Sequence, residues 1–196
     1  MSADELDTIY LAYAGMEASL TAIRVFGERA IPGLLQTREY AEAVTASSLI
    51  PGDPALRQAV DKRLERQVVQ AARQPKMRGF YVLDEAVLHR SPGSLEVLRE
   101  QLEHLADCAA RPETTIRILP FRTGIQLLND STCIFTREDG TTGVYCDMGG
   151  GDPVPPFFIA EPHRIARLET CFEATAEAAL PPEDSVALIE AAARAL

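Results

Sequence analysis

The sequence predicts an α+β fold in which several helices pack against a small, mostly antiparallel sheet. Several segments repeat apolar residues every three or four positions, as amphipathic helices do. Shorter segments are rich in β-branched and aromatic residues, which favour strands. Two of these short segments flank the turn Glu138-Asp139-Gly140, which predicts a β-hairpin late in the chain. Helices and strands in this mixed order are typical of α+β domains.

The first third of the chain is expected to hold a helix, a strand and a second helix. Residues 3–22 form the first helix, because apolar side chains follow a helical spacing there: Leu6, Ile9, Tyr10, Tyr13, Met16 and Leu20. Residues 23–26 then read as a short strand. Pro32-Gly33 breaks the chain, and Thr37 can cap a helix over residues 38–47.

The middle third alternates helices and strands. Residues 55–74 are rich in helix-forming residues, with an expected buried face of Leu56, Val60, Leu64 and Val68. Residues 77–83 read as a strand. Ser94 can cap a helix over residues 95–110, with an expected buried stripe of Leu95, Leu98, Leu102 and Leu105. Residues 114–119 are the clearest strand, which Pro120 ends.

The last third is expected to hold the hairpin and two helices. The hairpin strands are residues 132–136 and 143–147. Pro162 suits the first turn of a helix over residues 163–178, and acidic residues follow Pro182 at the start of the last helix. We found no repeat, low-complexity tract or convincing linker, so residues 1–196 are interpreted as a single domain.

The charge and the apolar pattern limit the function classes. The chain has 19 Lys and Arg against 29 Asp and Glu, a net charge of −10. Such a surface repels nucleic acid phosphates, so no direct nucleic acid partner is expected, whereas a basic protein partner is compatible with it. The sequence has no secretory signal and no apolar run of about 20 residues that could span a bilayer. A cytoplasmic protein without membrane contact is therefore expected.

The cysteines and glycines give no sign of a cofactor. None of the four cysteines lies in a CxxC pair, so neither a zinc ribbon nor a redox motif is predicted. A Cys–His pair with His104 or His163 has no support from the spacing. The run at 149–151 lacks the GxGxxG spacing of a dinucleotide site, and no GxSxG, HExxH or Walker motif occurs. We expect no cofactor and no metal.

Six short segments in a fixed order resemble the C-terminal domain of actinobacterial XRE-family, antitoxin-like transcription regulators. They are Pro32–Thr37 with Tyr40, Arg63–Gln67, Leu83–Ala86 with Leu88 and Arg90, Arg99–Leu102, Ile118–Phe121 with Gly124, and Ala179–Pro181 with Ser185. The resemblance implies a sensor or partner-binding role. A helix-turn-helix domain normally precedes this domain in the family, and the residues before Pro32 offer no room for one. The chain departs from the family around the hairpin, at residues 130–133 and 145–147.

The candidate ligand-binding residues are polar side chains beside the predicted breaks. Gln36 and Tyr40 follow the Pro-Gly turn, with a structural role for both as the alternative. Arg90 follows a strand, and Arg122 lies in a loop after a strand, where binding residues concentrate. Glu85 and His89 are four residues apart and could share a helix face, but no third metal ligand is nearby. Arg63, Arg66 and Arg73 are expected on a solvated face of the long helix.

Two functions follow from these observations. The first is a regulatory module without its own DNA binding, which binds a small molecule or a protein partner and is compatible with a homo-oligomer. The alternative is a regulator domain recruited as a cofactor-free enzyme of specialised metabolism that catalyses a cyclisation or isomerisation. Its catalytic candidates are Glu85, Tyr145 and Asp147.

Overall fold

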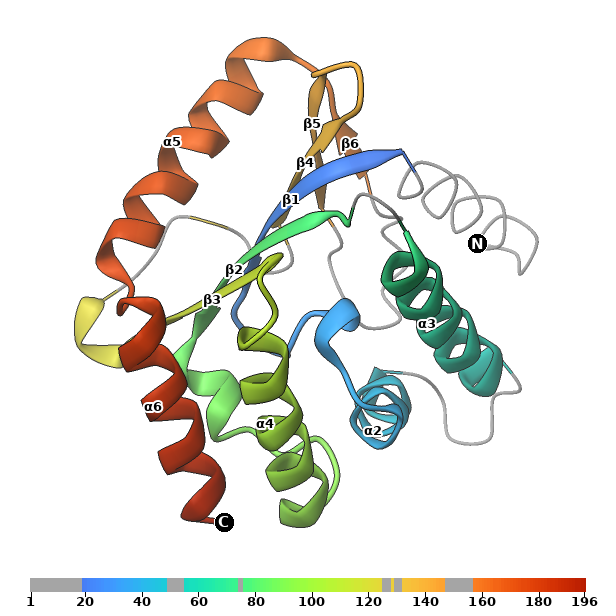
Figure 1. Cartoon of the computed structure of the whole chain (residues 1–196), viewed down its shortest axis with the longest axis vertical. Helices are drawn as coiled ribbons and strands as arrows, with labels where there is room; N and C mark the ends of the chain where they lie inside the picture. Colours follow the sequence, from blue (N-terminus) through green and yellow to red (C-terminus); the bar gives the residue numbers. More distant parts are fainter. Residues whose placement is uncertain (1–18, 49–54, 74–75, 125–127, 129–131, 147–156) are drawn as a thin grey trace.

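A computed structural model describes residues 19–48, 55–73, 76–124, 128, 132–146 and 157–196 (Figure 1). Its elements in chain order are β1 (Leu20–Gly27), the 3-10 helix η1 (Gly33–Leu35), α2 (Arg38–Ser48), α3 (Ala55–Ala72), β2 (Arg78–Asp84), η2 (Glu85–Leu88), α4 (Leu95–Ala109), β3 (Thr114–Leu119), η3 (Phe121–Thr123), β4 (Thr132–Arg137), β5 (Thr142–Cys146), β6 (Phe157–Ile159), α5 (Pro162–Ala178) and α6 (Pro182–Arg194).

These elements confirm the α+β class and most of the expected segments. The strand at 114–119, the hairpin and the helices after Thr37, Ser94, Pro162 and Pro181 are present. The first predicted helix falls largely outside the described residues. Its last residues were assigned wrongly, because Leu20 already begins β1. Strand β6 was not predicted, because its three residues are too few to show a pattern.

The six strands form one mixed sheet in the order β3-β2-β1-β4-β5-β6. β1–β4, β4–β5 and β5–β6 pair antiparallel, whereas β1–β2 and β2–β3 pair parallel. The parallel pairs follow from connectivity, since a helical crossover returns the chain to the edge at which the previous strand began. Helices α2 and α3 make the first crossover and α4 makes the second.

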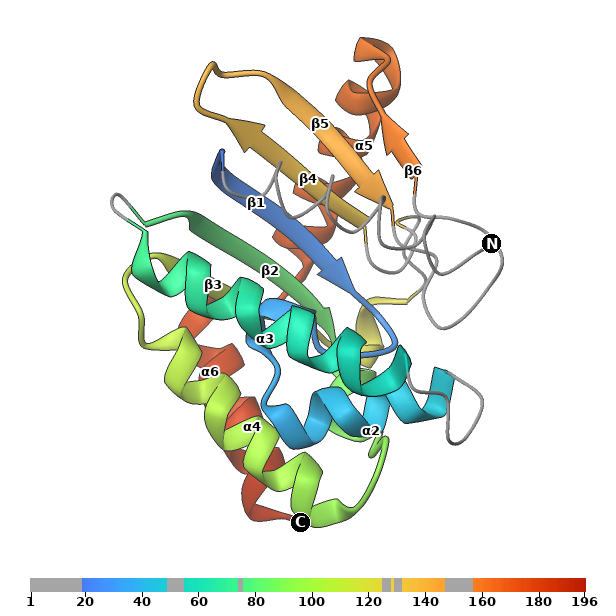
Figure 2. The same ribbon diagram turned by 90° about the vertical axis from the view of Figure 1, so that its right-hand side faces the viewer.

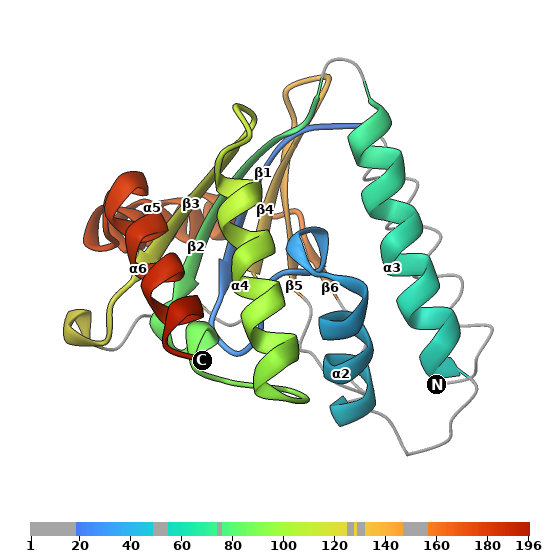
Figure 3. The same cartoon turned by 60° about the horizontal axis from the view of Figure 1, so that its bottom comes forward.

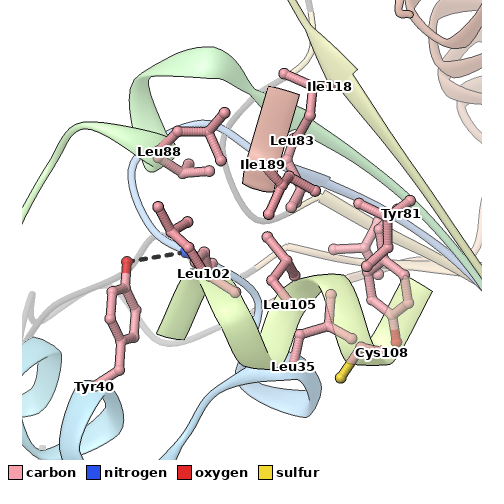
Figure 4. Packing of buried hydrophobic residues seen from close by; sticks show 14 of the residues in the cluster. Leu35, Tyr40, Tyr81, Leu83, Leu88, Leu102, Leu105, Cys108, Ile118 and Ile189 are labelled. Atoms are coloured by element: carbon pink, nitrogen blue, oxygen red, sulfur yellow. Dashed lines mark hydrogen bonds between the residues drawn. The ribbon is translucent and has the colours of Figure 1, made fainter. Parts of the chain in front are cut away.

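Alternating strand residues bury the two faces of the sheet in separate apolar clusters. On one face Ile23, Tyr81 and Ile118 pack with residues of α2, α4 and α6 (Figure 4). On the other face Phe26 and Val82 pack with residues of α5. Figures 1 and 2 accordingly show α5 across the sheet from α4. None of the described helices is long and apolar enough to cross a membrane.

Two residues expected in buried stripes lie at the surface instead. Val68 of α3 is 68% exposed and Leu95 of α4 is 58% exposed, although Val60 and Leu98 on the same helices are buried. Helix α3 packs mainly on α2 and η1 and stands away from the sheet, so its later turns do not reach the core (Figure 3). Leu95 is the first residue of α4, where the helix has only begun to approach the sheet.

The outer edge of β3 is covered by the segment between α5 and α6. The backbone N–H of Ile118 donates to Ser185 Oγ (2.9 Å), and the N–H of Leu180 donates to the Ile118 carbonyl (2.8 Å). The Arg117 guanidinium donates to the carbonyls of Ala179 and Leu180. This edge therefore has hydrogen-bond partners within the chain and is closed to strand addition.

Candidate functional site

The structure brings several candidate residues to one edge of the sheet. The parallel strands β1, β2 and β3 end at this edge with Gly27, Asp84 and Leu119. Strand β5 ends there too, because it runs antiparallel to β4, which runs antiparallel to β1. Ligands of sheets with parallel strands commonly bind outside the carboxyl ends of those strands.

A hydrogen bond accepted by Glu85 joins the loops that follow β2 and β3. Glu85 opens η2, whose start is capped by Asp84 Oδ1, the acceptor from the N–H of Ala86 (2.8 Å). Glu85 Oε2 accepts from the backbone N–H of Phe121 (2.8 Å), the first residue of η3. The short connections after the two neighbouring strands are thus held against each other.

His89 extends this connection with a stacked ring. Its imidazole lies over the Phe121 ring with centroids 6.0 Å apart and an interplanar angle of 27°. Its Nε2 is 3.9 Å from Glu85 Oε1, the oxygen that Phe121 does not use. We call this group the carboxyl-edge cluster. It comprises Glu85, His89 and Phe121, together with Arg90 and Arg122, which follow His89 and Phe121 in the sequence.

The carboxyl-edge cluster offers an apolar ring beside positive charge. Phe121 is 60% exposed, although its backbone N–H is hydrogen-bonded to Glu85. Arg90 and Arg122 are exposed, and neither has an ion-pair partner among the described residues. A planar ligand could stack on Phe121 while an anionic group on the same ligand binds a guanidinium. The described residues include no group of His, Cys, Asp and Glu that could hold a metal ion.

Gln36 and Tyr40 lie in the protein interior, away from this edge. Gln36 is 4% exposed, donates to the Ile31 carbonyl (2.6 Å) and accepts from Arg63 (2.7 Å). Tyr40 is 1% exposed, and its hydroxyl oxygen accepts from the N–H of Ile31 (3.3 Å; Figure 4). Burial raises the pKa of Tyr40, and the hydrogen bond from Ile31 opposes that shift in part. Both side chains therefore have partners within the fold.

Two further glutamines fasten the same turn to α3 and α4. Gln101 of α4, fully buried, accepts from the N–H of Thr37 (2.7 Å) and donates to the Leu35 carbonyl (2.8 Å). Gln67 of α3 donates to the carbonyls of Gly33 (2.7 Å) and Gln36 (2.9 Å). This network was not predicted from the sequence, and Arg63 was expected on a solvated face. The available signal was Gln101, a polar residue within the apolar stripe of α4.

Tyr145 lies in a different part of the sheet from Glu85. Its ring contacts Phe158 of β6 with centroids 5.2 Å apart, and Phe158 in turn meets Phe135 of β4 at 6.4 Å. Strand β5 is three strands from β2, which corresponds to about 14 Å. Asp147 lies outside the described residues. Within the described part of the chain, the structure therefore does not place the catalytic candidates around one reacting atom.

Cys108 does lie against His104, and the thiol of this pair is buried. Cys108 Sγ is 3.4 Å from His104 Nε2, one turn away on α4, and Cys108 is fully buried. Burial raises the pKa of Cys108, and burial together with the nearby Arg111 lowers the pKa of His104. A buried protonated thiol is a poor nucleophile, so this pair packs within the fold. None of the described cysteines, Cys108, Cys133, Cys146 and Cys171, forms a disulfide.

One comparison with known proteins gave a match. A family model described as "Domain of unknown function (DUF5753)" matches residues 10–191, which is nearly the whole chain. No curated protein and no solved structure matches significantly.

Proposed function

The chain belongs to the DUF5753 family, and we propose that it is a regulatory module that binds a small organic anion at the carboxyl-edge cluster. The observation that carries the proposal is the exposed ring of Phe121, held in place by Glu85 and His89. Arg90 and Arg122, the sequence neighbours of His89 and Phe121, are exposed and have no ion-pair partner within the described part of the chain. An exposed ring near two exposed arginines offers an anionic ligand both a stacking surface and positive charge, although the chain as a whole has a net charge of −10.

The edge on which the cluster lies supports a binding role. Loops at the carboxyl ends of parallel strands commonly bind ligands, because a rigid sheet positions them while their side chains remain accessible. Glu85 is only 20% exposed and already accepts the N–H of Phe121, so it positions the ring and is poorly placed as a general base.

The resemblance to the effector domain of XRE-family regulators supports the regulatory part of the proposal. The segments that carry the resemblance include Pro32–Thr37, Arg63–Gln67 and Ala179–Pro181 with Ser185. Gln67 binds the turn at Gly33, and Ser185 binds the edge strand at Ile118, so these segments hold the fold together. We take these segments as the part that the chain has in common with those regulators, and we expect ligand choice to depend on exposed residues such as Phe121 and Arg122. The net charge also disfavours direct binding of duplex DNA.

The catalytic alternative has less support from the geometry. A cyclisation or isomerisation needs its acid and base within reach of one substrate. Glu85 and Tyr145 are separated by three strand spacings, about 14 Å, and the Glu85 carboxylate is engaged by a backbone N–H. A reaction at the β5 end of the sheet would depend on Tyr145 without Glu85.

Native mass spectrometry of the protein purified from its own host tests the proposed site. We expect a small anionic molecule to co-purify with the wild type and to be lost from the Phe121→Ala and Arg122→Ala variants. The matched controls are Phe158→Ala, which truncates another exposed phenylalanine, and Arg167→Ala, which removes an exposed arginine on α5. Loss of the molecule from Phe158→Ala with retention in Phe121→Ala would move the site to the aromatic group around Tyr145.

A further inference from the structure

Strand β4 is buried on a face where the described helices pack mainly elsewhere. Phe135 of β4 pairs in register with Ile23 of β1, so the two side chains lie on the same face. Phe135 is 4% exposed, and Cys133 on the same face is 6% exposed. Of the helices on this face, α4 and α6 contact β3, whereas β4 has its main described contacts with its neighbouring strands β1 and β5. The described helices therefore do not explain the burial of Phe135.

Helix α3 has a buried side chain outside the two apolar clusters of the sheet. Val60 is 1% exposed, yet neither cluster contains Val60 or any other described residue of α3. The helix stands away from the sheet (Figure 3). An apolar side chain at such low exposure needs neighbours that exclude water from it. A segment packed between α3 and β4 would bury both Val60 and Phe135.

The chain enters β1 between the ends of α3 and β4. The backbone N–H of Glu138, the residue that follows β4, donates to the Ser19 carbonyl (3.2 Å). Arg73, which follows α3, donates to the Leu20 carbonyl (2.7 Å). The residues that precede Ser19 therefore start from a point that is fixed to both of these elements.

The segment before this point, residues 3–18, lies outside the described residues and has the sequence pattern of an amphipathic helix. Its apolar residues follow a helical spacing: Leu6, Ile9, Tyr10, Tyr13 and Met16. A helix of this length extends about 24 Å, which is nearly the length of α3. The match to the family model begins at residue 10, so the second half of the segment belongs to the matched domain.

We propose that residues 3–18 form an amphipathic helix that packs between α3 and β4 and completes the core on this face. Counted back from Ser19, Met16 and Tyr13 are at the distance of Phe135 and Cys133, and the first turns of the helix reach Val60. Burial of this apolar face stabilises the arrangement. The carboxyl-edge cluster takes no part in it, so the inference goes beyond the proposed function.

NMR of the full chain, labelled with ¹³C at the methionine methyl groups, tests the contact directly. We expect nuclear Overhauser effects between the Met16 methyl group and the Phe135 ring. The Met16→Leu variant assigns the Met16 signal, and Met77, which is buried in the same cluster as Phe135, is the positive control. A Met16 methyl group without any such effect to β4 overturns the proposal.

Thiol alkylation followed by mass spectrometry tests the same contact from the side of the sheet. We expect Tyr13→Asp to accelerate the modification of Cys133 at least about tenfold, because a buried carboxylate displaces the helix. Cys108, buried beside α4 in the same cluster, should stay protected and shows that the rest of the protein remains folded.

The matched control is Thr8→Asp, which adds the same charge on the opposite side of the predicted helix and should leave the Cys133 rate within about twofold. Equal Cys133 rates in the wild type and both variants would mean that another segment covers β4, and would overturn the proposal. If Cys108 and Cys133 become reactive together in Tyr13→Asp, the variant has unfolded, and the Met16 measurement on the intact chain decides.

Discussion

Individual polar residues of the 31–37 turn act within the fold. Gln36 connects the Ile31 carbonyl to the Arg63 guanidinium, and Gln101 satisfies backbone groups on both sides of Gln36. A buried polar group that loses its partner costs more than the hydrogen bond itself contributes. The free energy of unfolding should therefore be sensitive to each of these side chains.

Replacing Gln36 tests this role. We expect Gln36→Leu to lower the free energy of unfolding by about 1–3 kcal/mol, because the Ile31 carbonyl and Arg63 lose a partner. Urea denaturation measures the change, and Gln58→Ala, at an exposed position of α3, is the control. A Gln36→Leu protein as stable as the control, but defective in ligand retention, would return Gln36 to the ligand-binding residues.

The environment of His104 makes the free energy of unfolding depend on pH. Burial and Arg111 hold its folded pKa below the usual value, so the unfolded chain takes up the proton first as the pH falls. Stability linked to His104 is therefore present above about pH 6.5 and is lost as the pH falls through the folded pKa. The free energy of unfolding should drop less between about pH 7.5 and about pH 5.5 in His104→Gln than in the wild type. Gln58→Ala, at an exposed position of α3, should lose as much stability over this range as the wild type.

Single residues of the site were only partly predictable from the sequence. Arg90 and Arg122 could be chosen because they follow strands, and the structure leaves them exposed at one edge. Gln36 and Tyr40 were chosen for their position after a turn, yet both are buried. Their burial depends on which helices pack against the turn. The residues that bind the turn, Arg63, Gln67 and Gln101, are more than 25 residues away from it in the sequence.

At the level of elements, the Ser185 hydroxyl connects α6 to the edge strand β3. Ser185, in the first turn of α6, is fully buried and accepts the N–H of Ile118. We expect Ser185→Ala to lower the free energy of unfolding by about 1–3 kcal/mol and to speed exchange of the Ile118 amide hydrogen. Hydrogen exchange followed by NMR measures the second effect. Ser47→Ala, at an exposed position of α2, should change neither quantity, and unchanged Ile118 exchange in Ser185→Ala would contradict the role assigned to the hydroxyl.

Elements were easier to predict than their pairing. Caps and prolines located α4, α5 and α6, and the alternation of strand and helix between residues 77 and 119 contained the signal for parallel pairing. The predicted hairpin instead indicated a mostly antiparallel sheet, and the parallel pairs were not predicted. The exposure of Val68 and Leu95 could not be predicted from spacing. Both residues follow the same apolar spacing as their buried neighbours, and the spacing does not show how far along the helix the contact with the core extends.

Across the whole molecule, a scaffold with two covered sheet faces leaves the loops at the carboxyl edge accessible. The carboxyl-edge cluster lies in these loops, where Phe121, Arg90 and Arg122 are exposed. Helix α6 contacts η2 directly, so α6 supports the element that carries Glu85.

The most direct test of the binding site is NMR of the ¹⁵N-labelled protein with the low-molecular-weight fraction of its host's cytosol. A ligand at the carboxyl-edge cluster should shift the backbone amide signals of Phe121 and Arg122, because the N–H of Phe121 is hydrogen-bonded to Glu85 beneath the exposed ring. The amide signals of Phe158 and Gln36 should stay unchanged. Shifts confined to Tyr145 and Phe158, or no shifts at all, would contradict the proposed site.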